Sequence, residues 1–325
     1  MAILFEPIDR FTRARSDPAE GAGNNRMDAR LIAAMEVYGR LVDQFRDRPE
    51  DMAALLASET DAALQTVLRH MTDRVAFARE VLGFVPEPQQ DVALRSWARR
   101  IILNCNRQWG KSTVCAIRAL HRAWFWPGSL ILLVSRAHPQ SGGLMQKIRA
   151  FLPALDLGGG RQLQPTKGDG VNRLSLQFPN GSRIVALPGG QKPTRSYSKV
   201  AMVIVDEAGM VPDPVHDAVA PTLVRTNGEL ILASTPMGKR GAFYRTWQYG
   251  GEGWLRVFGP VDESKPGKLS LEFLKDARAR RGEDYYAQEY LCQFLDADSH
   301  LFSEDAIQKV IRQDVETWEE GRRPR

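Results

Sequence analysis

The sequence has few of the features that would place it in a membrane or an oxidising compartment. No apolar run approaches the roughly 20 residues that a membrane-spanning helix needs, and the N-terminus lacks the basic segment and apolar core of a secretory signal. The chain has 3 cysteines in 325 residues, without a Cys-x-x-Cys pair or a mixed Cys/His ligand spacing. These absences argue against a disulfide framework, structural zinc and a membrane partner, so we expect a soluble protein of a reducing, intracellular compartment.

The composition is that of a folded protein of ordinary hydrophobicity. With 43% hydrophobic residues, the chain is long enough for one large α/β domain with smaller appendages, and it is neither fibrous nor disordered. The formal net charge of +5 and the pI near 9.2 are compatible with a polyanionic partner. Many cytosolic enzymes share this mild basicity, so charge alone does not identify nucleic acid as the partner.

Local patterns divide the chain into a polar start, a helical region and a strand-rich core. Residues 1–27 are mixed and polar and predict a flexible arm, whereas apolar residues recur at helical spacing over 28–82. A Pro-Asn-Gly turn at 179–181 predicts an antiparallel hairpin. Short apolar runs predict buried strands at 101–104, 130–135, 183–187, 200–205 and 230–233. Strands alternating with helices favour an α/β fold whose mainly parallel sheet is covered by helices on both faces.

The most informative segment is 101–113, in which an apolar strand runs into a loop ending Gly-Lys-Ser-Thr and then into an amphipathic helix. Loop N–H groups and the positive end of the helix can hold a polyphosphate, Lys111 can reach its β and γ phosphates, and the Ser112 hydroxyl can ligate Mg²⁺. Cys105 replaces the usual first Gly, so we predict a relaxed P-loop; the alternative is a strand-to-helix turn that merely contains Gly-Lys-Ser. The other loop residues expected around the nucleotide are Asn106, Gln108, Trp109, Gly110 and Thr113.

A second signal is the uninterrupted apolar run at 200–205, which ends in Asp206 and Glu207. Buried parallel strands present functional groups at their carboxyl ends. We expect Asp206 to hold the Mg²⁺ hydration shell opposite Ser112, and Glu207 to orient and polarise the water that attacks the γ-phosphate. The alternative is a solvated acidic turn, and the P-loop earlier in the chain weighs against it.

A third apolar run, at 229–233, is followed by Ser234, Thr235 and a proline that ends the strand. The two hydroxyls are placed to sense the γ-phosphate and to pass its loss to whatever holds DNA. Taken alone, a plain Ser-Thr-Pro turn is the simpler interpretation. Because this run follows a P-loop and an acidic strand along the chain, we favour the functional interpretation.

These three elements, in this order, resemble the ATPase domain of the large terminase subunit, the DNA-packaging motor of tailed phages. The resemblance covers about residues 80–302, and its most specific part is Asn-Arg-Gln-Trp-Gly-Lys-Ser-Thr at 106–113, because terminases carry an Arg inside a P-loop without its first Gly. Further matching segments are 134–141, 194–197, 241–244 and 290–296. The resemblance implies a P-loop NTPase fold of the RecA-like ASCE type.

The resemblance also implies roles for single residues. Gln90, or alternatively Gln89, stands where the family has an adenine-contacting Gln after a Pro, although a Pro/Gln turn opening a helix would look the same. Arg107 would stabilise γ-phosphate charge within its own subunit. Arg195 would act in trans on a neighbouring subunit, and a solvated loop Arg or a DNA-backbone contact is the alternative. The family has Arg-Gly at this point, and this chain has Arg195-Ser196.

The implied cofactors are ATP and Mg²⁺, and the implied partners are double-stranded DNA, the portal protein of a procapsid and the small terminase subunit. Copies of the chain would form a ring when assembled, with a monomer in isolation left open, in the cytoplasm of an infected bacterial host. DNA contacts would be phosphate-directed and independent of sequence. A solvated helix face is the alternative for each candidate contact: Arg95, Trp97, Arg99, Arg100, Lys239, Arg240, Tyr244, Arg278, Arg280 and Arg281.

The expected domain boundaries follow from the same resemblance. Residues 83–255 would form the ATPase core, 256–300 a small lid or linker subdomain, and 301–325 a connection toward a nuclease domain that full-length relatives carry. An RNase H-like nuclease needs several carboxylates from separate strands, and the acidic residues after 295 match the connection instead. We therefore expect no nuclease activity and no metal site there; a truncated chain and a separate nuclease polypeptide both remain open.

Two rival functions use the same motifs. A DExx-type helicase shares the Asp-Glu pair and a Gln before the P-loop, but it needs a second RecA-like domain for which the chain after Pro236 is too short. A P-loop assembly adaptor would bind DNA or a capsid vertex without turnover. Such a scaffold would not need Lys111, Ser112, Asp206 and Glu207 together.

Overall fold

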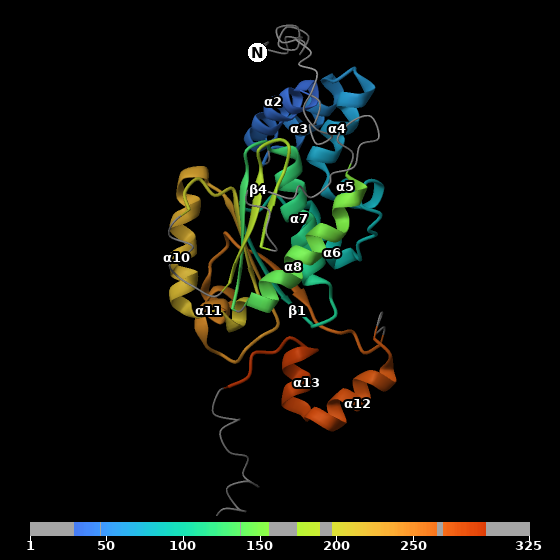
Figure 1. Cartoon of the computed structure of the whole chain (residues 1–325). Coiled ribbons are helices and arrows are strands. Elements are labelled where there is room, and N and C mark those ends of the chain that lie inside the picture. Colours follow the sequence, from blue (N-terminus) through green and yellow to red (C-terminus); the bar gives the residue numbers. More distant parts are fainter. Residues whose placement is uncertain are drawn as a thin grey trace, which may run out of the picture.

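The computed structural model describes residues 29–45, 47–136, 138–155, 174–188, 197–264 and 269–296. In this part of the chain seven strands form one sheet in the order β3-β4-β2-β5-β6-β1-β7 (Figure 1). The strands are β1 (Arg100–Cys105), β2 (Leu130–Ser135), β3 (Ser175–Gln177), β4 (Arg183–Pro188), β5 (Met202–Asp206), β6 (Glu229–Ser234) and β7 (Leu255–Gly259). The five predicted strands are all present.

The sheet is parallel except at one edge, where β3 pairs with β4 in antiparallel register. The predicted hairpin turn joins these two strands, and Gly181 has φ +81°, a left-handed conformation that glycine adopts without strain. Asn180 fixes the turn from inside, because its Nδ2 donates to the carbonyls of Ala123 and Trp124 at 2.9 and 2.8 Å. The predicted α/β fold is confirmed.

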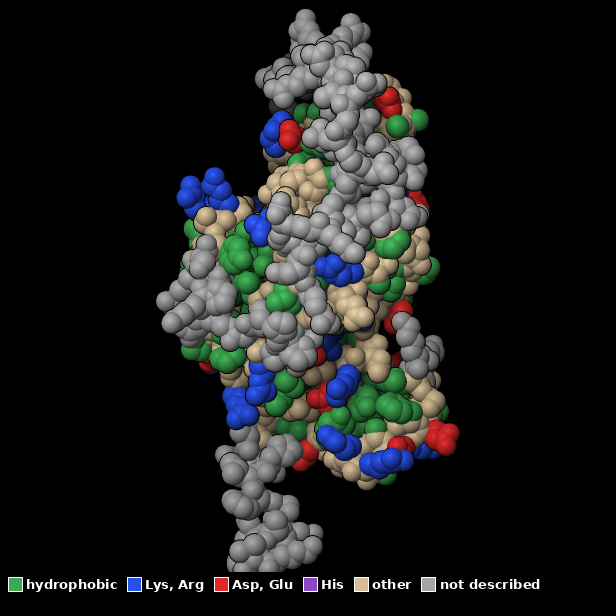
Figure 2. Space-filling model, in the orientation of Figure 1, with side chains coloured by type: hydrophobic (Ala, Val, Ile, Leu, Met, Phe, Trp, Pro, Cys, Tyr) green, Lys and Arg blue, Asp and Glu red, His purple; other side chains and the backbone are tan. Residues whose placement is uncertain are grey.

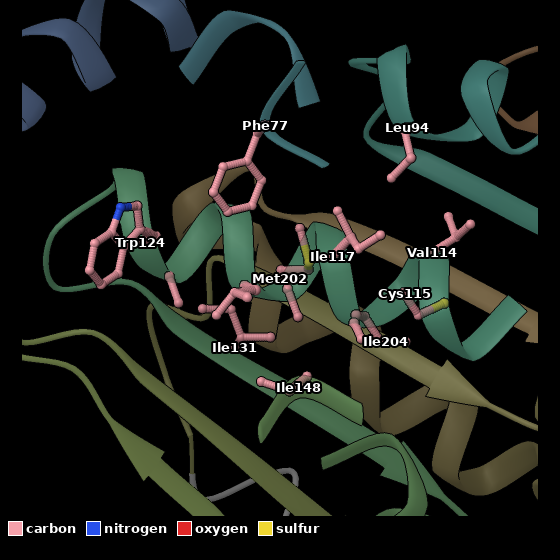
Figure 3. Close-up of a cluster of buried hydrophobic side chains, with 14 of the residues drawn as sticks. Phe77, Leu94, Val114, Cys115, Ile117, Trp124, Ile131, Ile148, Met202 and Ile204 are labelled. Atoms are coloured by element: carbon pink, nitrogen blue, oxygen red, sulfur yellow. The ribbon is translucent and has the colours of Figure 1, made fainter. Parts of the chain in front are cut away.

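Helices cover both faces of the sheet, which explains why the strands are apolar without interruption. Alternate strand residues enter two separate cores. Figure 3 shows the first core, in which Ile131, Met202 and Ile204 pack against Ile117 and Ile148. The helices of this face are α7 (Lys111–Phe125) and α8 (His138–Phe151); the opposite face packs against α10 (Asp213–Leu223) and α11 (Gly241–Tyr249) (Figure 1).

Helices also form the N-terminal part of the described chain: α2 (Ala29–Phe45), α3 (Pro49–Ser58), α4 (Ala62–Thr72), α5 (Arg74–Glu80) and α6 (Pro88–Arg95). They lie at one end of the sheet beside α7 (Figure 1). The indole of Trp126, just after α7, donates to the Gly39 carbonyl on α2 at 3.1 Å. No helix in the described residues is long and apolar enough to cross a membrane.

Beyond β6 the sheet extends into the range expected for the lid. Strand β7 pairs in parallel with β1, and its alternate residues, such as Val257, enter the core of the α7 face. The chain then forms α12 (Leu271–Arg281) and α13 (Glu283–Glu289), which we call the lid helices. They pack around a small apolar cluster of their own that contains Val261, Leu274, Tyr286 and Tyr290.

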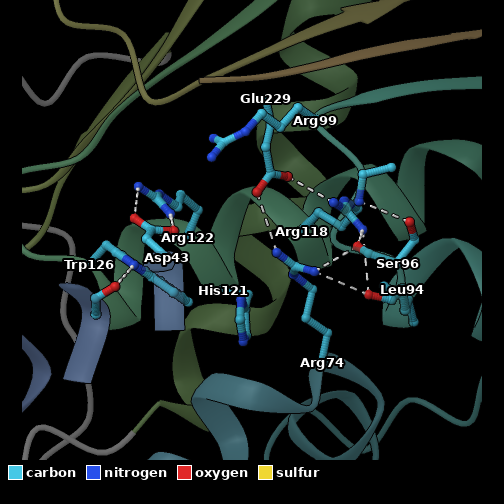
Figure 4. Close-up of polar contacts among 12 residues, drawn as sticks. Asp43, Arg74, Leu94, Ser96, Arg99, Arg118, His121, Arg122, Trp126 and Glu229 are labelled. Atoms are coloured by element: carbon cyan, nitrogen blue, oxygen red, sulfur yellow. Dashed lines mark hydrogen bonds and ion pairs between the residues drawn. The ribbon is translucent and has the colours of Figure 1, made fainter. Parts of the chain in front are cut away.

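A buried ion-pair cluster joins helices to the start of β6. The Nη2 atoms of Arg118 and Arg74 lie 2.7 and 3.4 Å from the carboxylate of Glu229, and all three side chains are at most 2% exposed (Figure 4). Both arginines also donate to the Ser96 carbonyl after α6, at 2.9 Å each. Arg74 stacks over Trp97, with the guanidinium carbon 3.9 Å from the ring centroid. The cluster thus holds α5, α6, α7 and β6 together.

The cluster predicts a large loss of stability from one small change. Glu229→Gln keeps the shape of the side chain but leaves two buried guanidinium groups without a carboxylate, which costs about 3–5 kcal/mol of unfolding free energy. Urea unfolding of the purified chain measures this. The control is Asp276→Asn in the exposed Asp276–Arg280 pair, where we expect a loss of at most about 0.5 kcal/mol. Equal losses in the two variants would show that the buried pair does not stabilise the fold.

Candidate phosphate-binding site

The three predicted sequence elements end at one edge of the sheet. Strand β6 lies between β1 and β5, with Asn104 opposite Ser234 and Asp206 opposite Ala233. Since parallel neighbours share their direction, the P-loop after β1, the acids after β5 and the hydroxyls after β6 lie side by side. The relative placement of these motifs agrees with the sequence prediction.

The loop after β1 is fixed by its own polar groups. The backbone N–H and the Nδ2 of Asn106 both donate to the Gly259 carbonyl at the end of β7, at 2.8 and 2.9 Å. The Asn106 Oδ1 accepts from the Gln108 N–H at 2.9 Å. Gly110 has φ +94°, and a Cβ there would lie 2.8 Å from the Nε2 of Gln90, so this position requires glycine. Helix α7 begins at the next residue.

Lys111 is buried and points into the loop. Its ammonium group donates to the carbonyls of Cys105 and Asn106 at 2.8 and 2.9 Å, and the residue is 6% exposed. An ammonium group has three donors, so one can face a phosphate held by the loop. Two backbone carbonyls of the loop thus fix the position of the Lys111 ammonium.

The two glutamines before the P-loop have different surroundings. Gln90 is buried, its Oε1 accepts from the Glu87 N–H at 2.9 Å, and its Nε2 donates to the Trp109 carbonyl at 2.5 Å. Gln89 is exposed, and its Oε1 accepts from the Trp109 indole at 2.8 Å. Gln90 thus supports the loop, and which of the two reads adenine stays a prediction. The Trp109 ring is buried and packs against Gly259, and its backbone carbonyl accepts the Gln90 hydrogen bond.

Asp206 is a buried carboxylate in unfavourable surroundings. Burial, together with the neighbouring Glu207 carboxylate, raises its pKa to about 6, and the Lys111 ammonium opposes this rise. Asp206 also acts on the pKa of the Cys115 thiol, which burial raises. Cys115 and Ser112 lie three residues apart on one face of α7. The Ser112 hydroxyl and the Asp206 carboxylate are oxygen donors of the kind that Mg²⁺ prefers, and their role as its ligands stays a prediction.

Glu207 lies on a turn that two other elements hold. It has φ +51°, which is a strained conformation for a residue with a side chain. The Gly209 N–H donates to the Ser234 hydroxyl at 3.0 Å, and the ring Nε2 of His216 lies 3.0 Å from the Ala208 carbonyl. Ser234 therefore connects β6 directly to the acidic turn. Thr235 is buried beside it.

Of the two arginines predicted to act on the γ-phosphate, the structure describes Arg107 only. Arg107 is exposed, and its backbone N–H donates to the Glu289 carbonyl of α13 at 3.3 Å. Burial raises the pKa of the Tyr290 phenol beside this contact, and the charge of Arg107 opposes the rise. Arg195 lies outside the described residues.

The basic residues predicted to contact DNA do not form one stripe. Arg95 and Arg99 precede β1, and Arg100 begins it at the amino edge of the sheet, whereas the others follow β6 or belong to α12. On the face shown in Figure 2, Lys and Arg side chains border a hydrophobic area on the lid helices. Several of them are already ion-paired: Arg95 with Asp73 and Asp91, Lys239 with Asp296, Arg278 with Glu263, and Arg280 with Asp276.

Sequence patterns missed two residues that shape this edge. His216 follows a proline-containing turn after the acidic strand and supports the acidic turn from α10. Asn104 ends the apolar run Ile-Ile-Leu-Asn, is fully buried, and donates from Nδ2 to the Cys292 carbonyl at 3.1 Å. A single polar residue at the end of an apolar strand was the available signal for Asn104.

This geometry defines the class of the fold. A phosphate loop after one strand, carboxylates after a second and hydroxyls on the parallel strand between them make a P-loop NTPase fold of the RecA-like ASCE type. Residues 102–309, more than half of the chain, match the family described as "Terminase large subunit, T4likevirus-type, N-terminal", and the chain belongs to this family. The resemblance seen in the sequence is confirmed.

Known proteins agree with this assignment. The large terminase subunit of Thermus virus P23-45 is 27% identical over an alignment of 261 positions, which covers 69% of this chain and 52% of the relative. The chain spans about half the length of the curated relatives it matches. The ATPase domain of the Thermus phage P74-26 large terminase has a TM-score of 0.56 and 22% identity, covering 67% of this chain and 97% of that one. The HK97 bacteriophage large terminase has a TM-score of 0.56 and 16% identity, and the match covers 69% of this chain and 55% of that one. These two structures support the fold.

The raised pKa of Asp206 predicts a pH-dependent effect of its replacement. A carboxylate with a raised pKa in the folded state destabilises the fold as pH rises from about 4 through about 6. Asp206→Asn should therefore raise the free energy of unfolding by about 1–3 kcal/mol at pH 7.5. This gain in stability should vanish near pH 4. Urea unfolding at both pH values measures this.

Asp213→Asn is a control of opposite sign. The hydrogen bond from Arg245 lowers the pKa of Asp213, so this carboxylate stabilises the fold above its ordinary pKa and loses that effect as the pH falls. Asp213→Asn should lower stability at pH 7.5 and have less effect in acid. A loss of stability in Asp206→Asn at pH 7.5 would contradict the interpretation of Asp206 as a costly buried charge.

Proposed function

We propose that this chain is the ATP-hydrolysing motor part of a phage large terminase, which drives double-stranded DNA into a procapsid. The observation that supports this most is the buried Lys111 ammonium in the loop next to the buried Asp206 carboxylate. Burying both charges is unfavourable, and a scaffold without turnover would not need them. Membership of the terminase family favours DNA packaging as the use of this chemistry.

In this proposal the loop N–H groups, the start of α7 and Lys111 bind the phosphates of ATP. Ser112 and Asp206 would hold Mg²⁺, which would supply positive charge to offset the negative charge of the phosphates. Glu207 accepts a hydrogen bond from the attacking water and takes its proton. Because Ser234 holds the turn after Glu207, loss of the γ-phosphate can move β6 and the acidic turn together.

Two arginines complete the proposed site. Arg107 acts within the subunit, since it belongs to the phosphate loop itself, and Arg195 acts on the neighbouring subunit of a ring. The ring docks on the portal protein, receives DNA with the small terminase subunit and works in the cytoplasm of an infected bacterial host. An arginine supplied in trans can change the rate by about 10³–10⁵.

Glu207→Gln tests the catalytic assignment. The change removes the base but keeps the shape, so we expect turnover of ATP to fall by about 10²–10⁴ while ATP still binds. Steady-state phosphate release and nucleotide titration measure the two properties separately. Glu252→Gln, at an exposed carboxylate remote from the site, should leave both unchanged. Normal turnover in Glu207→Gln would refute the assignment.

Complementation tests whether Arg195 acts in trans. Arg195→Ala leaves the phosphate loop intact, and Lys111→Ala leaves Arg195 intact, so each variant alone should be nearly inactive. If the arginine acts across an interface, an equimolar mixture should regain ATPase activity that rises with total protein concentration. A mixture of Arg107→Ala with Lys111→Ala is the control, because a residue acting in cis cannot be complemented. No recovery in the first mixture would assign Arg195 another role.

A further inference from the structure

After the lid helices the chain returns across the carboxyl edge of the sheet. We call residues 289–296 the strap, and Figure 1 shows them leading from α13 back to the core. The strap accepts hydrogen bonds from the phosphate loop, from strand β1 just before that loop, and from the loop after β6. The Arg107 N–H donates to the Glu289 carbonyl at 3.3 Å, the Asn104 Nδ2 to the Cys292 carbonyl at 3.1 Å, and the Lys239 N–H to the Leu295 carbonyl at 2.8 Å.

Asn104 supplies the buried side-chain contact of this set. The bonds from Arg107 and Lys239 are backbone to backbone, and the Lys239–Asp296 ion pair is exposed to solvent. Asn104 is fully buried and Cys292 is 2% exposed. Cys292 has φ +57°, a conformation that persists only where its surroundings hold it. The Asn104 amide therefore bonds to the strap at its most constrained residue.

The position of Asn104 is not explained by packing alone. Its Oδ1 is buried without a hydrogen-bond partner in the described residues, and such atoms are rare in folded proteins. The preceding strand residues are apolar, so a leucine here would fill similar space without that penalty. Asn104 also stands opposite Ser234, whose hydroxyl holds the acidic turn. The amide thus lies between the strap and the strand that positions Glu207.

We propose that Asn104 is a positioning residue that fixes the strap to the end of the P-loop strand, and so keeps the lid helices in register with Lys111, Ser234 and Glu207. Its effect on hydrolysis rests on the function proposed above, whereas its bond to the strap is independent of that function. With the bond removed, the strap separates from β1 more often, and the catalytic groups lose their fixed spacing.

The test compares Asn104→Leu and Asn104→Ala with a matched control, Asn180→Ala. Asn180 is also buried, and its Nδ2 makes two hydrogen bonds far from the site, so its loss should destabilise the fold at least as much. The first readout is N-ethylmaleimide labelling of Cys292, resolved by peptide mass spectrometry, with buried Cys115 as internal reference. The second is the kcat and KM of ATP hydrolysis.

We expect both Asn104 variants to label Cys292 about tenfold faster relative to Cys115, because local opening exposes the thiol. We expect kcat to fall about 10- to 100-fold with little change in KM, as for misplaced catalytic groups. Asn180→Ala should change neither readout. Asn104→Ala removes the same hydrogen bond with a smaller side chain, so the test does not depend on whether leucine packs at this position.

Unchanged Cys292 labelling in both Asn104 variants would overturn the proposal, and so would an equal loss of kcat in Asn180→Ala. Labelling needs no nucleotide. An unmutated chain without ATPase activity would therefore contradict the proposed function while labelling still decides whether Asn104 holds the strap.

Discussion

The parallel pairing of β6 with both β1 and β5 is the constraint on which the rest of the structure depends. It places Ser234 between the phosphate loop and Asp206, because parallel strands in register end at one edge. A parallel sheet must be covered on both faces, so the strands are apolar throughout and helices form two cores. The antiparallel β3 at the edge leaves this arrangement unchanged.

A buried ion pair also joins β6 to helix α7, which follows the phosphate loop. Helix α7 carries Lys111 in its first turn and Arg118 two turns later, and β6 carries Glu229 at its start and Ser234 at its end. The buried Arg118–Glu229 pair, at 2.7 Å, therefore fixes the middle of the helix to the start of the strand, away from the phosphate loop. Burying such a pair costs desolvation energy, but removing one member leaves an unpaired buried charge, which destabilises the fold more. It makes the helix and the strand one rigid support.

The site itself contains features that oppose stability. Asp206 is buried with a raised pKa, Glu207 has a left-handed backbone conformation, and Lys111 is buried with its charge. Strain and buried charge persist at functional sites because the surrounding fold supplies the stability. Here the support comes from the Ser234 hydroxyl, the Asn106 side chain and the Gln90 amide, each of which holds a backbone segment of the site.

The sequence by itself determined the elements and motifs that depend on neighbours in the chain. Apolar runs marked the strands, the Pro-Asn-Gly turn marked the hairpin, and Gly110, Lys111, Asp206 and Glu207 marked the ends of two strands, because turn conformation and strand ends are local properties. Only the tertiary structure decided which strands are neighbours, that β7 joins the sheet, that Gln90 supports the P-loop, and that Asn104 contacts the strap. Asn104 and Cys292 are 188 residues apart, and Arg74 and Glu229 are 155 apart. No local pattern encodes such contacts, since they form only when packing of the two cores brings distant segments together.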